Sequence, residues 1–263
     1  MREDPKNRDL LYVGTEFGLF ISLDGGRNWE KFMNNYHTVR TDDILIHPRD
    51  GDLIAATHGR SIWIADDITP LQQWNAQVAS ADATLFDVRP AVAYLSDIRL
   101  DVSTGGEKQF EGENPQRGTA IQFHIKAGVT GDAKVTIADP SGRSLCETTV
   151  KAAPGIHRVQ WTLVTPMANM AGAGRGGRGG GAGGGPPAGG AAPAAGAAPA
   201  AGAATPPPQA AGPAPNVSCT GATGGRGGAA GAAPGSYIAK LSVGGKDYVK
   251  PVTVLEDRWM TER

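Results

Sequence analysis

The chain has 263 residues and a formal net charge of −1, with Lys+Arg 25 against Asp+Glu 26. This balance gives no broad positive field, which argues against nucleic acid or an anionic membrane surface as a partner. No run of about 18 apolar residues occurs, so we expect no membrane span.

Short runs of β-branched and aromatic residues, separated by turn residues, predict antiparallel β-structure through residues 10–66. The expected strands are 10–14, 18–22, 29–32, 44–48, 53–57 and 61–65. Residues 12–20 and 55–63 each hold a strand, a threonine, a glycine-bearing bend and a second strand, at a period of roughly 43 residues. Because β-propeller blades repeat at this period, we expect residues 1–73 to be C-terminal blades of a β-propeller.

One octet is especially informative. Residues 22–29 read Ser-Leu-Asp-Gly-Gly-Arg-Asn-Trp, an S-x-D-x-G-x-x-W pattern. Its glycines are free to adopt positive φ, and Ser22 and Asp24 can bond backbone amides across the turn. We expect Trp29 to fold under the turn as a plug beside Gly26. These residues therefore predict a hairpin turn with a structural role and do not predict a catalytic site.

The remainder of the chain predicts a second β domain. We expect residues 74–118 to be a linker and residues 119–257 to form an immunoglobulin-like or fibronectin-like β-sandwich, because apolar and polar residues alternate there between turns. A low-complexity insertion over 168–234, rich in Ala, Gly and Pro, interrupts it and is expected to be a disordered loop. The expected fold class is all-β.

The sequence holds two cysteines, Cys146 and Cys219, which flank the low-complexity segment. Two interpretations remain open: a disulfide that ties down the base of the loop, or two unpaired thiols.

The octet, together with residues 12–15, 52–60 and 66–68, resembles the Asp-box (BNR-repeat) proteins of bacteria, which have sortilin-like or sialidase-like β-propellers and are often labelled glycosyl hydrolases. The resemblance implies a secreted or periplasmic, cell-envelope protein in which a large propeller precedes a β-sandwich. It also implies that this chain is the C-terminal portion of a longer protein, with an export signal expected upstream.

In sialidases with this motif, a Tyr/Glu pair supplies the nucleophile, an Asp acts as the acid, and three arginines hold a carboxylate of the substrate. The Asp-box lies away from that site. At most two blades are present here, so we expect a non-catalytic binding or assembly role, with catalytic residues unknown and no cofactor. The expected partners are the upstream blades and a protein, peptide or glycan ligand. The alternative is a fragment of a glycoside hydrolase or sialidase-like enzyme whose catalytic residues lie on upstream blades.

Two residues of the second repeat, His58 and Arg60, are candidates for the propeller mouth, although a His-Gly-Arg sequence between strands also suits a structural bend. Asp66 and Asp67 are adjacent, and neighbours on a strand point to opposite faces, so we expect capping or salt bridging and not a glycosidase pair. The histidines lack metal-ligand spacing, so no metal site is predicted.

Overall fold

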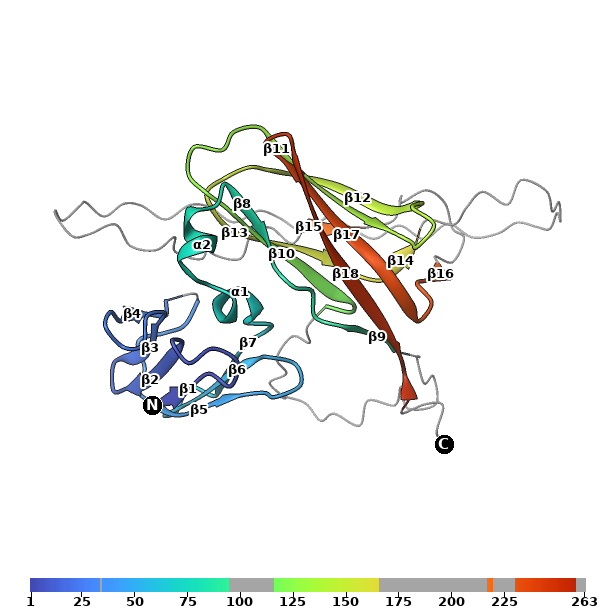
Figure 1. The fold of residues 1–263 in the computed structure, drawn as a ribbon. Coiled ribbons are helices and arrows are strands. Elements are labelled where there is room, and N and C mark those ends of the chain that lie inside the picture. The colour runs from blue at the N-terminus through green and yellow to red at the C-terminus, as the bar shows by residue number, and fades with distance from the viewer. Residues whose placement is uncertain (34, 95–115, 166–216, 220–229, 259–263) are drawn as a thin grey trace, which may run out of the picture. The chain divides into compact units, whose positions relative to one another are not determined.

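The computed structural model describes residues 1–33, 35–94, 116–165, 217–219 and 230–258. Within these residues the fold is all-β, as predicted, with two short helices beside several sheets (Figure 1). Most of the predicted insertion over 168–234 lies outside the described residues. The parts of it that are described are two short strands, β15 (Val217–Cys219) and β16 (Ala230–Gly231), and the residues just after β16.

The first sheet is an antiparallel meander in the order β1-β2-β3-β4. Its strands are β1 (Arg2–Glu3), β2 (Leu11–Thr15), β3 (Gly18–Ser22) and β4 (Glu30–Lys31). The second sheet is also an antiparallel meander, in the order β5-β6-β7. Its strands are β5 (Thr41–Ile46), β6 (Leu53–Thr57) and β7 (Ile62–Ala65). Strands β2 to β7 correspond to the six strands expected between residues 10 and 66.

These two sheets share one hydrophobic cluster. Alternation along each strand directs one set of side chains inward, so Tyr12 and Leu19 of the first sheet join Leu53 and Ala55 of the second, all at most 2% exposed. Gly14 lies where the sheets approach, since a Cβ there would stand 2.7 Å from the carbonyl oxygen of Thr41. The two meanders are therefore closely packed structural units.

The segment expected to be a linker contributes regular structure. It contains the helices α1 (Thr69–Gln72) and α2 (Ala76–Ser80) and the strands β8 (Ala83–Leu85) and β9 (Ala91–Ala93). Strand β8 pairs with β10 and strand β9 with β18, so both belong to the sheets of the C-terminal half. Runs of three residues are too short to give a period in the sequence. They are strands because their apolar side chains, Leu85 among them, enter the core of those sheets.

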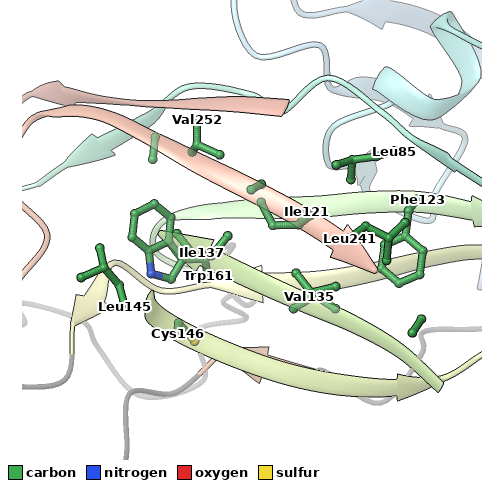
Figure 2. Packing of buried hydrophobic residues seen from close by; sticks show 14 of the residues in the cluster. Leu85, Ile121, Phe123, Val135, Ile137, Leu145, Cys146, Trp161, Leu241 and Val252 are labelled. Carbon is green, nitrogen blue, oxygen red and sulfur yellow. The ribbon is translucent and has the colours of Figure 1, made fainter. Parts of the chain in front are cut away.

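The C-terminal half consists mainly of two sheets around a second core. One has the order β15-β13-β10-β8 and the other β12-β11-β17-β18-β9. The remaining strands are β10 (Thr119–Ile125), β11 (Asp132–Ala138), β12 (Ser144–Lys151), β13 (Gly155–Trp161), β17 (Gly235–Val243) and β18 (Lys246–Glu256), with β14 (Val164–Thr165) pairing β16. Figure 2 shows Ile121, Phe123, Ile137, Trp161 and Leu241, all fully buried, projecting into this core from both sheets.

Candidate functional site

The predicted Asp-box residues form the turn between β3 and β4. The buried Ser22 hydroxyl donates to Asp24 Oδ1 at 2.8 Å and accepts the backbone N–H of Gly26 at 2.9 Å. Asp24 accepts the Asn28 backbone N–H at 2.9 Å and the Asn28 side-chain amide at 2.6 Å. These hydrogen bonds from Asn28, chiefly that of its backbone, lower the pKa of Asp24 to about 2. The carboxylate is therefore ionised at neutral pH and holds the turn.

Two tryptophans make the same kind of contact at different places in their meanders, because Trp29 lies between β3 and β4, whereas Trp63 lies on β7, the counterpart of β3. Trp29 Nε1 donates to the carbonyl oxygen of Gly26 at 3.0 Å, and Trp63 Nε1 donates to the carbonyl oxygen of Arg60 at 2.9 Å. In both repeats the acceptor lies three residues before the tryptophan. Trp29 is 38% exposed, so its ring caps the turn and is less buried than the expected plug. The threonines are equivalent, because Thr15 ends β2, Thr57 ends β6, and each donates a side-chain hydrogen bond to a carbonyl across its hairpin.

The candidates His58 and Arg60 both lie on the exposed bend between β6 and β7. The backbone N–H of His58 donates to the Arg40 carbonyl at 2.9 Å, and its Nδ1 lies 3.5 Å from Asp42 Oδ2. Arg60 contributes the backbone carbonyl that Trp63 uses. The contacts of both residues at this bend are consistent with the structural interpretation.

The adjacent carboxyl groups after β7 occupy different environments. Asp67 is buried, has a φ of 56°, and its Oδ1 accepts the Thr69 hydroxyl at 2.6 Å, so it stabilises the start of α1. Burial raises the pKa of Asp66, and the nearby charge of Asp52 raises it further. The N-cap of α1 is Ile68, which makes no side-chain capping bond, and Asp67 instead bonds the backbone N–H and hydroxyl of Thr69 from one residue further out.

An ion pair that the sequence did not indicate joins the same region. Arg89 lies 2.8 Å from Asp52 Oδ1, with both side chains about four-fifths buried, and also donates to the Asp50 carbonyl at 3.1 Å. Asp52 Oδ1 accepts the backbone N–H of Asp67 as well. A separation of 37 residues between Arg89 and Asp52 leaves no local pattern that could have predicted this pair.

A buried polar cluster closes the N-terminal segment onto α1. Asp4 is 2% exposed and accepts hydrogen bonds from the Tyr12 hydroxyl at 3.2 Å and from Gln72 Nε2 at 3.0 Å. Burial and the Asp4 carboxylate raise the pKa of the Tyr12 phenol far above its usual range. The cluster connects residues before β2 to α1 after β7, and so holds the two ends of this region together.

A partly open apolar recess of about 40 Å³ lies between the two meanders. Its lining comes from β3, β6, β7 and the segment between β4 and β5: Leu19, Phe32, Tyr36, Leu53, Ala55, Trp63, Ile64 and Ala65. Most of this lining belongs to the hydrophobic cluster that the two meanders share, so the recess is a small hollow in that core.

Of the two cysteines, Cys146 lies on β12 and is disulfide-bonded. Among the described residues, no group of three or more His, Cys, Asp or Glu side chains could hold a metal ion. Within the same residues, no helix has the length and hydropathy to cross a membrane.

Comparisons with protein-family models, curated proteins and solved structures gave no match.

Proposed function

We propose that this chain is the C-terminal part of a secreted Asp-box propeller protein, in which two propeller blades and a β-sandwich have a binding or assembly role. The support for blades is the repetition of one construction. Both meanders carry the threonine contact across the hairpin, from the last residue of β2 and from the last residue of β6.

The observation that carries the proposal is that the β5-β6-β7 sheet is apolar on both faces. Leu53 and Ala55 lie on the inner face and are 2% exposed, whereas Leu45, Ile62 and Ile64 lie on the outer face and are 55%, 64% and 57% exposed. The register aligns Leu45 with Ile54 and Ile54 with Ile64, so the outer residues form one continuous patch. A sheet with two apolar faces suits a unit that stacks between neighbours in a repeat array.

The sheet of β11 and β17 has a different character, unlike β10 of the facing sheet, which is buried along its whole length. On β11 and β17, buried Val135 and Leu241 alternate with the more exposed Lys134, Lys240 and Ser242. One apolar and one polar face is the pattern of an antiparallel sheet that covers a core on one side and meets water on the other. This pattern, and the core shared by the two sheets, support the β-sandwich.

Cysteine chemistry supports an oxidising location. Cys146 is disulfide-bonded, and Cys219 is the other cysteine of the sequence. We infer a Cys146–Cys219 bond across the base of the low-complexity segment. Disulfides persist mainly in secreted, periplasmic and cell-surface proteins, which agrees with the proposed location.

The decisive experiment is to sequence the genomic DNA upstream of the Met1 codon, in frame, over several hundred codons. We expect further S-x-D-x-G-x-x-W octets at a spacing of roughly 43 residues and an export signal. An in-frame stop codon directly before Met1 would contradict the proposal, because no upstream blades would then exist.

An activity assay of the longer protein then distinguishes the binding role from the glycoside hydrolase alternative. The longer protein should be purified and assayed for hydrolysis of aryl glycosides and aryl sialosides. Turnover that is lost when an upstream carboxylate is replaced would favour the glycoside hydrolase alternative over the binding role.

A further inference from the structure

Strand β7 lies at the edge of its sheet. In the first meander the corresponding strand, β3, has β2 on one side and β4 on the other. In the second meander the strand order ends at β7, which pairs with β6 alone within the described residues. The second repeat therefore lacks a counterpart of β4 there.

The backbone of β7 offers hydrogen-bonding groups at this edge. Thr57 N–H donates to the Ser61 carbonyl at 3.2 Å, which makes these two residues a hydrogen-bonded pair of the hairpin. Hydrogen-bonded pairs alternate along an antiparallel ladder, so Trp63 and Ala65 bond toward β6. The N–H and C=O groups of Ile62 and Ile64 consequently point outward, and the structure gives them no partner in the residues that it describes.

The side chains of β7 include no charge and no proline that would hinder another strand from pairing with this edge. Natural edge strands are commonly protected by charges or proline, whereas β7 reads Ile-Trp-Ile-Ala. It is the longest edge strand without a charged residue in the described part of the chain. For comparison, β4 is Glu-Lys, β5 contains Asp42 and Asp43, and β12 contains Glu147 and Lys151.

The two ends of β7 carry opposite charges. Arg60 lies in the bend just before the strand, is exposed, and its guanidinium makes no hydrogen bond or ion pair with the other described residues. Asp66 follows the strand directly and is partly exposed, with Arg89 and Arg158 near it. In an antiparallel pair of identical strands, the start of one lies beside the end of the other, so Arg60 of one copy would meet Asp66 of the second copy.

We propose that the β7 edge is a strand-addition site whose occupant is β7 of a second copy of this chain. The two strands pair antiparallel about a two-fold axis, with Ile62 of one copy opposite Ile64 of the other. Charge complementarity at both ends fixes the direction, and the interface is isologous. This self-association goes beyond the proposed role of the outer sheet face and does not depend on it.

Sedimentation velocity over a concentration series tests the proposal on the intact chain. The interface is small, so we expect a dimer at about 100 μM that dissociates near about 1 μM. Ile62→Lys and Ile64→Lys should each give monomers at about 100 μM, because a charge protects an edge from pairing. Leu45→Lys is the matched control: Leu45 is similarly exposed on the same face of the sheet but lies on β5, with β6 between it and β7, so this variant should still dimerise.

A charge exchange makes the test specific. Arg60→Asp and Asp66→Arg should each be monomeric alone, because like charges then meet at both ends of the strand pair. A mixture of the two variants should dimerise, because each interface regains two opposite-charge pairs. Far-UV circular dichroism confirms that each variant is folded.

Hydrogen exchange provides a second readout on the unaltered chain. The amides of Ile62 and Ile64 should become protected as concentration rises, while those of Trp63 and Ala65 should be protected throughout. A chain that is monomeric at every concentration, or whose mixed charge variants fail to associate, would overturn the proposal. A dimer that survives Ile64→Lys would place the interface elsewhere and would overturn it as well.

Discussion

Ser22 shows how a single hydroxyl can hold an entire turn. It is 1% exposed, accepts the Gly26 N–H and donates to Asp24. We predict that Ser22→Ala destabilises the N-terminal sheets by about 1–3 kcal/mol, because a backbone N–H is left without its partner. Urea unfolding followed by tryptophan fluorescence measures this effect.

The chain offers a matched control for that variant. Ser141 also donates to an aspartate two residues before it, Asp139, but in an exposed turn. We expect Ser141→Ala to change the unfolding free energy by less than about 0.5 kcal/mol, since water replaces the lost bond. Equal effects of the two substitutions would show that burial of Ser22 does not matter.

His124 makes stability depend on pH. Its side chain is 4% exposed, its Nδ1 has no hydrogen-bond partner among the described residues, and its ring meets the edge of Trp74 at 5.0 Å. Burial lowers the pKa of His124, and His157 lowers it further. As the pH falls through about 6.5, the unfolded chain therefore takes up a proton before the folded chain does, and stability decreases.

We predict that the urea midpoint falls between about pH 7.5 and about pH 5.5, and that His124→Gln reduces this fall. The variant His58→Gln, on the exposed bend, is the control and should keep the pH dependence of the unaltered chain. An unchanged pH dependence in His124→Gln would assign the effect to other groups.

At the scale of elements, the disulfide of Cys146 constrains the C-terminal sheets. If Cys219 is its partner, the bond closes a loop of about 70 residues and should contribute about 4 kcal/mol, mainly by restricting the unfolded chain. We predict that reductant lowers the unfolding free energy by this order, and that Cys146→Ser/Cys219→Ser lowers it equally and removes the effect of reductant. A midpoint that does not respond to reductant would argue against the pairing.

At the scale of the whole molecule, two separate hydrophobic clusters predict two unfolding transitions. Leu19→Ala alters the N-terminal cluster and Ile137→Ala the C-terminal one, where the side chains are 1% and 0% exposed. Each should cost about 2–5 kcal/mol in its own transition and little in the other. Calorimetry checks this result, and one transition that moves equally in both variants would contradict it.

The sequence predicted well where a local period or turn residue was strong. Strand β3 was expected with its exact bounds, and Gly25 and Gly26 of the turn after it adopt φ values of 72° and 90°. The strands β8 and β9 were expected to be linker, because runs of three residues carry no period. The propeller, the sandwich and the catalytic status stay predictions, as do the binding roles of His58 and Arg60.

The sequence by itself determined the β character of the chain, the hairpin at Ser22 to Trp29 and the lack of a broad charged field, because these depend on neighbouring residues and composition. Only the tertiary structure decided the Arg89–Asp52 ion pair, the Asp4 cluster and the outward-facing edge of β7. Such features depend on which distant residues meet and which strands lack a neighbour. Packing of the whole chain fixes both, and no local pattern encodes them.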